Sequence, residues 1–257
     1  MKRTVFSTVM ILVIILLVSC GQNLDPQLNR LDELKIQYDN VGSQHNSELN
    51  GMLNVYNNYT GITSYANCCD LADEHFSHIA TGVVAGQVMD LLGDFRYFAK
   101  PCINEEIIDL LADSINIIST YPEVFDSISV ILDSPIGIEA KKTLLETVYL
   151  YADEKIEDAD DKESVMNGIS TTIHSLEYWD ENYTEWQNTL TGAFAKPSLG
   201  IIGAIGIIDG VGAVIGTLEG IRDTYRGQEG RVRIIAGRAI GEAAKTSTYA
   251  VLALVLL

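Results

Sequence analysis

The stretch LGIIGAIGIIDGVGAVIGTL, Leu199 to Leu218, constrains the fold of this chain more than any other segment. It is twenty residues long, it holds six glycines, and its single charge is Asp209. A glycine inside a helix costs about 1 kcal/mol relative to alanine. A helix that keeps so many glycines must therefore gain from close contact with another helix or from a membrane.

The small residues of this stretch follow helical spacing. A first stripe steps by three or four residues along Gly203, Gly206, Gly210, Ala213, Thr217 and Gly220, and a second run at a spacing of four consists of Gly212, Gly216 and Gly220. Small residues at this spacing let two helices approach closely, as in transmembrane helix pairs. The spacing resembles glycine-zipper segments of membrane-active peptides and of bacterial secreted proteins, and the resemblance implies helix pairing or membrane contact.

A second helix is predicted after a basic turn. Residues 222–233, RDTYRGQEGRVR, are polar and rich in glycine, and the apolar segment after them has Gly237 and Gly241 four residues apart. The two helices can pack antiparallel as a hairpin within residues 191–257. Because an unpaired carboxylate in lipid costs several kcal/mol, we expect Asp209 to pair with an arginine such as Arg238.

Three interpretations of residues 199–257 are open. The hairpin can dock against the rest of the chain, with its glycines used for helix packing in a water-soluble protein. It can insert into or lie on a membrane, as a pore-forming or toxin-like protein does, or it can be a plain transmembrane anchor. Asp209 discriminates between them, because a permanent span disfavours a carboxylate in its middle.

The N-terminus has the pattern of an export signal. Lys2 and Arg3 precede the uninterrupted apolar run VMILVIILLV, and LVSC follows at Leu17 to Cys20. The apolar run is short for a membrane span. LVSC resembles the lipobox of bacterial lipoproteins, in which a small residue precedes a cysteine that is acylated. The resemblance implies that residues 1–19 are a signal peptide and that Cys20 carries a lipid that anchors the protein in the bacterial envelope, at the outer membrane.

The charge of the chain limits its partners. Asp and Glu number 35 against 17 Lys and Arg, which gives a formal net charge of -18 at pH 7. Such a chain is repelled by the phosphates of nucleic acid, so we expect no nucleic-acid partner. The expected partners are the membrane through the lipid on Cys20, a protein that the sequence does not identify, and a second membrane contact or another copy through residues 199–257.

Residues 20–190 are predicted to form an acidic helical domain, because their apolar residues recur at intervals of three and four. Predicted helices cover about 24–56, 64–99, 104–119, 122–134, 137–156 and 162–190. Gly42 and Gly51 interrupt the first, which is therefore expected as one imperfect helix or two. The predicted fold class is all-α, a bundle or irregular array of short amphipathic helices followed by a C-terminal glycine-rich helical hairpin, with Trp179 and Trp186 as core anchors.

The cysteines beyond Cys20 predict one disulfide. An exported protein meets an oxidising compartment, and adjacent cysteines are strained partners for each other. We therefore expect Cys102 to bond either Cys68 or Cys69, which leaves one thiol free.

Catalytic and metal-binding patterns are weak. Glu74 and His78 stand one helical turn apart, but no second cluster of metal ligands accompanies them. The acidic stretch 153–163 lacks the glycine and closing glutamate of an EF-hand loop and is expected to join two helices. We predict a protein that is not an enzyme, with no metal and no cofactor apart from the lipid on Cys20.

Overall fold

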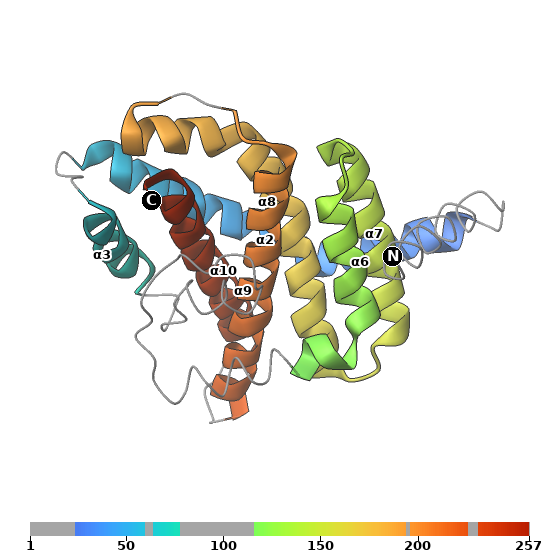
Figure 1. Cartoon of the computed structure of the whole chain (residues 1–257). Coiled ribbons are helices and arrows are strands. Elements are labelled where there is room, and N and C mark those ends of the chain that lie inside the picture. The colour runs from blue at the N-terminus through green and yellow to red at the C-terminus, as the bar shows by residue number, and fades with distance from the viewer. Residues whose placement is uncertain (1–23, 60–63, 78–115, 194–195, 226–230, 257) are drawn as a thin grey trace.

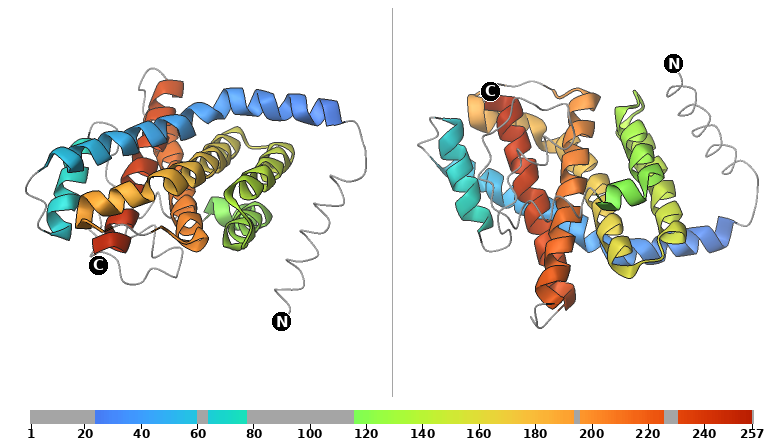
Figure 2. Two further views of the ribbon diagram at one scale, coloured as in Figure 1. Left: turned by 90° about the horizontal axis from the view of Figure 1, so that it is seen from above. Right: turned by 60° about the horizontal axis from the view of Figure 1, so that its bottom comes forward.

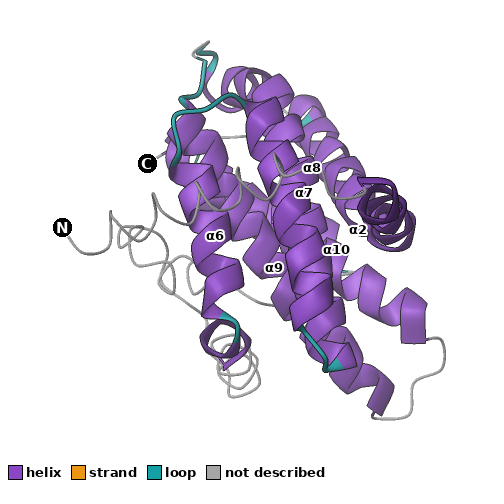
Figure 3. Ribbon diagram, turned by 90° about the vertical axis from the view of Figure 1, so that its right-hand side faces the viewer, coloured by secondary structure: helices purple, strands orange, loops and turns teal. Residues whose placement is uncertain are grey.

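The computed structural model describes residues 24–59, 64–77, 116–193, 196–225 and 231–256 (Figure 1). The signal segment, Cys20 and Cys102 lie outside these ranges. The described elements are the helices α2 (Leu24–Asn58), α3 (Tyr65–Phe76), α6 (Pro122–Asp133), α7 (Ile138–Lys155), α8 (Ala159–Thr191), α9 (Leu199–Tyr225) and α10 (Arg231–Leu256). The predicted all-α class with a C-terminal glycine-rich hairpin is confirmed, and within the described residues short loops join the helices (Figure 3).

The apolar stripe of α2 lies on one continuous helix, and both of its glycines are points of close contact with other helices. A Cβ atom added at Gly42 would lie 2.8 Å from the carbonyl oxygen of Ser170 on α8, and one added at Gly51 would lie 3.3 Å from the ring of His75 on α3. The stripe buries Leu31, Leu34, Tyr38, Val41, His45, Leu49, Met52 and Tyr56. The glycines therefore bring neighbouring helices close to α2 without ending it.

Local signals fix the ends of the middle helices. Pro122 occupies the first turn of α6, where its missing N–H is not needed. The side chain of Asp158 accepts hydrogen bonds from the backbone N–H groups of Asp160 and Asp161 at 3.0 and 2.9 Å and so caps the start of α8. The acidic stretch 153–163 thus spans the junction between α7 and α8, as expected. Gly192 ends α8 in the left-handed conformation, with φ of 71°.

The α9–α10 hairpin lies among the other helices. α9 contacts α8, α6 and α10, while α10 also contacts α2, α3 and α8. Figure 2 shows α2 and α8 crossing the hairpin, with α6 and α7 on one side and α3 on the other. Ile205 of α9 and Leu252 of α10 belong to the same apolar core as Leu49 of α2.

The centre of that core is aromatic and belongs mainly to α8. Trp179 and Trp186 are fully buried, with ring centroids 5.4 Å apart. The ring of Tyr56 on α2 packs edge-on against Trp186 at 5.7 Å, and the indole N–H of Trp186 donates to the hydroxyl of Tyr178 at 2.9 Å. The prediction that both tryptophans are core anchors is confirmed.

Candidate functional site

One row of α9 glycines faces α10. A Cβ atom added at Gly212 would lie 2.9 Å from the Cα atom of Ala243, and one added at Gly220 would lie 2.5 Å from the Cα atom of Ile235. At Gly216 an added Cβ would collide with the backbone of Arg238. A side chain at any of these three positions would therefore push α10 away from α9.

A second row faces α8 and α6. A Cβ atom added at Gly210 would lie 3.1 Å from the carbonyl oxygen of Gly168 on α8, and one added at Gly203 would lie 2.7 Å from the carbonyl oxygen of Leu132 on α6. Gly206 lies between these contacts, and an added Cβ there would meet α8 at ordinary distances. The glycines of α9 thus serve close contact on two sides of one helix.

The glycine spacing on α10 does not serve the same purpose at Gly237. A Cβ atom added there would meet nothing within 4 Å. Gly237 therefore does not take part in the close contact that Gly212, Gly216 and Gly220 of α9 make with α10.

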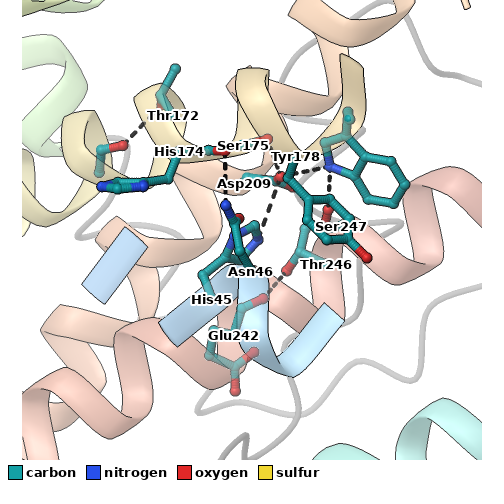
Figure 4. A network of polar contacts seen from close by, with 12 residues as sticks. His45, Asn46, Thr172, His174, Ser175, Tyr178, Asp209, Glu242, Thr246 and Ser247 are labelled. Carbon is teal, nitrogen blue, oxygen red and sulfur yellow. Dashed lines mark hydrogen bonds and ion pairs between the residues drawn. The ribbon is translucent and has the colours of Figure 1, made fainter. Parts of the chain in front are cut away.

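Asp209 is fully buried in the middle of α9, where polar groups of α8, α2 and α10 surround it (Figure 4). Its Oδ2 atom accepts hydrogen bonds from the hydroxyl of Ser175 at 2.5 Å and from the indole N–H of Trp179 at 3.2 Å. The same indole N–H lies 3.1 Å from the hydroxyl oxygen of Ser247 on α10. Asp209 therefore connects α9 to α8 and, through Trp179, to α10.

The expected pairing of Asp209 with Arg238 is wrong. The Nε and Nη2 atoms of Arg238 bond the carboxylate of Asp223 at 3.3 Å. Arg238 and Asp223 are both partly exposed, so neither charge is fully removed from water. The groups around Asp209 come instead from α8, from α2 and, through the hydroxyl of Ser247, from α10.

His45 of α2 is an ionisable side chain that lies next to Asp209. Its Nε2 atom lies 3.5 Å from Oδ2 of Asp209 and makes no hydrogen bond. Its Nδ1 atom lies 2.9 Å from Oδ1 of Asn46, whose amide nitrogen donates to the carbonyl oxygen of His174 at 3.0 Å. Because the amide oxygen of Asn46 can only accept, Nδ1 carries the ring proton. The lone pair of Nε2 therefore faces the carboxyl group of Asp209.

Burial shifts both members of this pair toward their neutral forms. It raises the pKa of Asp209 to about 7, although the hydrogen bonds from Ser175, Ser247 and Trp179 act in the opposite direction. Burial also lowers the pKa of His45 to about 4. A neutral carboxylic acid can hold its proton beside the bare Nε2 atom, so the pair carries no net charge. Both side chains are fully buried, so in this conformation they can hold a proton but cannot meet a solute.

The other residues singled out in the sequence do not form a second site with this pair. Cys68 and Cys69 of α3 form no disulfide with each other, and burial raises the pKa of each thiol to about 11. The predicted disulfide stays a prediction because it involves Cys102. Among the described residues, no group of three His, Cys, Asp or Glu side chains could hold a metal ion.

Both helices of the hairpin are long and apolar enough to cross a membrane. The most apolar windows of Leu199–Tyr225 and Arg233–Leu256 have mean hydropathies of 2.0 and 1.2. However, 72% and 83% of those windows are buried inside the protein. Buried core helices of water-soluble proteins satisfy the same criteria of length and composition, so burial and contacts carry more weight here than hydropathy.

Comparisons of the chain with family models, with curated proteins and with solved structures find no match. The functional inference therefore rests on the hairpin and the groups around it.

Proposed function

We propose that the protein is a lipid-anchored envelope lipoprotein with a non-catalytic structural or binding role. In this proposal acylated Cys20 holds an acidic helical body at the outer membrane, and the α9–α10 hairpin is the core of that body. The observation that carries the proposal is the two-sided contact of the α9 glycines, with the backbone of α10 on one side and with the backbones of α8 and α6 on the other.

The energetics of glycine support a packed hairpin. Each glycine weakens a helix by about 1 kcal/mol relative to alanine, and a lipid environment by itself needs no gap in the helix surface. The gaps at Gly210, Gly212 and Gly216 are filled by helices of the same chain. Such contacts recover dispersion energy that a larger side chain would prevent.

The surroundings of Asp209 support the same proposal. Its hydrogen-bond donors Ser175 and Trp179 belong to α8, and His45 belongs to α2. A hairpin that left the body for a membrane would lose these groups and expose a carboxyl group to lipid, which is costly. The packed arrangement keeps them together.

Lipid anchoring is tested by changing the acylated residue. We expect the full-length protein to sediment with the membrane fraction and to incorporate a labelled fatty acid, and we expect Cys20→Ser to lose both properties. Cys69→Ser is the matched control and should keep both. Label on the Cys20→Ser protein would contradict the anchor, as would a wild-type protein that stays in the soluble fraction.

The core role of the hairpin is tested with the non-acylated body, residues 21–257, beside a version truncated after Leu190. We expect the full body to be a folded monomer with a cooperative thermal transition. The truncated body should lose helical content and cooperativity, because α2 and α8 would expose the surfaces that α9 and α10 cover. A truncated body with an unchanged transition would contradict a core role for the hairpin.

A second candidate function is membrane activity, and the observation that favours it is the span-like length and apolarity of both hairpin helices. In a pore-forming or toxin-like protein, the other helices would cover this hairpin in water. The hairpin would then separate from them and insert at a target membrane. Dye release from vesicles distinguishes the two functions: the membrane-active protein would cause leakage, whereas the packed lipoprotein would cause none.

A further inference from the structure

A cavity of about 350 Å³ lies between α6, α8 and α9. This volume falls within the size range of small-molecule sites. Apolar side chains from all three helices line it, including Phe125 and Ile128 of α6, Ile169 of α8 and Val211 of α9. Gly210, Val211 and Val214 of α9 line the cavity, which therefore lies beside the close contact that Gly210 makes with α8.

The deep part of the cavity offers no free polar group among the side chains that line it. Thr172 is the polar side chain that α8 contributes, and its hydroxyl donates to the carbonyl oxygen of Gly168 at 2.9 Å. A ligand therefore gains nothing from placing a polar atom there. Dispersion contacts and the removal of apolar surface from water favour an alkyl chain.

The rim of the cavity on α6 is acidic. Asp126 and Asp133 both line the cavity, are exposed to solvent, and stand seven residues apart on one face of the helix with Ser129 between them. The nearby Lys141 is buried, and its ammonium group donates to the carbonyl oxygen of Leu132. The ammonium group of Lys141 interacts with Asp133 and offsets part of its charge. Two carboxylates against one ammonium group leave the rim negative, which attracts a cationic head group and repels an anionic one.

We propose that this cavity binds the single alkyl chain of an amphiphile whose ammonium head group lies against Asp126 and Asp133. This inference deepens the binding role proposed above and rests on it. The apolar lining selects the chain, and the acidic rim selects the sign of the head group. Binding at this cavity does not require the hairpin to move, because α9 already forms one of its walls.

The test uses the non-acylated body, residues 21–257, so that the lipid of Cys20 cannot occupy the cavity. Dodecyltrimethylammonium and dodecyl sulfate have the same chain and opposite head-group charges. Each compound is added, well below its critical micelle concentration, to protein that has bound a neutral naphthylamine dye. Displacement of the dye measures the affinity of the compound. We expect one site per monomer, with the ammonium compound bound at least about tenfold more tightly than the sulfate, a difference of about 1.4 kcal/mol.

Two kinds of variant locate the binding. Ala204→Trp places an indole in the cavity and should weaken both the dye and the alkyl ammonium by about tenfold or more. The double change Asp126→Lys and Asp133→Lys alters only exposed side chains and should reverse the head-group preference. Asp180→Lys changes an exposed carboxylate of α8 that does not line the cavity, and it should leave the preference unchanged.

Three results would overturn the inference: no stoichiometric binding of dye or alkyl ammonium, equal affinity for the two head groups in the wild type, or a preference that the double lysine change leaves intact. If Ala204→Trp fails to fold, the charge-reversal arm still decides the matter. The membrane-fraction experiment with Cys20→Ser is independent of all these titrations. A failure of the cavity inference is therefore distinguishable from a failure of the lipoprotein proposal.

Discussion

The Nε2 atom of His45 on α2 lies 3.5 Å from the Oδ2 atom of Asp209 on α9, and both side chains are fully buried. Asn46 holds the ring proton of His45 on the far side of the imidazole. The Asp209 carboxyl group is thus one of the buried polar groups that join the hairpin to the body, beside Thr217 of α9, which accepts a hydrogen bond from Asn167 of α8 at 3.1 Å. The protonation of Asp209 should decide how stable the packed hairpin is.

The pH dependence of folding follows from the signs of the two shifts. The pKa of Asp209 is raised to about 7 in the folded protein, so its stabilising contribution is complete below its ordinary pKa near 4 and is lost as the pH rises toward 7. The pKa of His45 is lowered to about 4, so its contribution is complete above pH 6.5 and is lost as the pH falls toward 4. Between about pH 4 and 6.5 the two effects oppose each other.

Asp209→Asn separates these contributions. The amide oxygen can accept from Ser175 and Trp179, and the amide nitrogen can donate to the bare Nε2 atom of His45. We expect the free energy of unfolding of the wild type, measured relative to this variant, to fall as the pH rises from 4 to 7, by up to about 1.4 kcal/mol per pH unit. Urea unfolding at a series of pH values measures this difference.

Asp223→Asn provides the control for that experiment. Asp223 is on the same helix and pairs with Arg238 near the hairpin turn, away from the buried pair. The difference in unfolding free energy between Asp223→Asn and the wild type should stay nearly constant between pH 5 and 7, because this change leaves the buried pair of Asp209 and His45 intact. A pH-independent difference for Asp209→Asn would show that Asp209 does not hold a proton in the folded protein.

Gly216 should tolerate no side chain. Alanine there would place a Cβ atom against the backbone of Arg238, and forcing α10 outward should cost about 1–3 kcal/mol of unfolding free energy. Gly237→Ala is the matched control on α10, where the space is open, and it should stabilise the protein by up to about 1 kcal/mol through helix propensity. Thermal and urea unfolding compare the two, and equal effects would refute close packing at Gly216.

Ser175 should tune the pKa of Asp209. Its hydroxyl donates to the carboxylate at 2.5 Å and so favours the charged form. Ser175→Ala should therefore raise the pKa of Asp209 further. The pH range over which the unfolding free energy falls should then extend to higher pH. Ser127→Ala removes a hydroxyl that donates to the carbonyl oxygen of Glu123 on α6 and is not among the groups that shift the pKa of Asp209. This control should leave the pH dependence of stability unchanged.

The predicted disulfide can be mapped directly. Peptides of the exported protein, digested without reducing agent, should contain Cys102 linked to Cys68 or to Cys69, with the third thiol free to react with an alkylating reagent after unfolding. Three alkylated cysteines in the unreduced, unfolded protein would contradict the bridge.

Local signals in the sequence predicted much of the helical fold. Pro122 and the residues around Asp158 mark helix starts because their effects act within one turn. The glycine spacing predicted close helix contact for α9. It did not show that the two rows face different neighbours, because a sequence pattern gives the faces of a helix but not the helices that cover them.

The partner of Asp209 could not be predicted in the same way. Opposite charge within the hairpin favoured Arg238, yet that side chain stays near the solvent with Asp223. The group that does face Asp209 comes from α2, far away in the chain. One signal was present: His45 stands in the apolar stripe of α2 between Val41 and Leu49, and a polar residue buried in such a stripe requires a polar neighbour.

Vesicle co-sedimentation with dye release, using the non-acylated body of residues 21–257, tests most directly whether the hairpin is a packed core. If it is, the protein stays in the supernatant as a folded monomer and releases no dye from zwitterionic or anionic vesicles. Sedimentation with the vesicles and leakage that both disappear when the chain is truncated after Leu190 would contradict the packed-core proposal and make α9 and α10 a membrane-active hairpin.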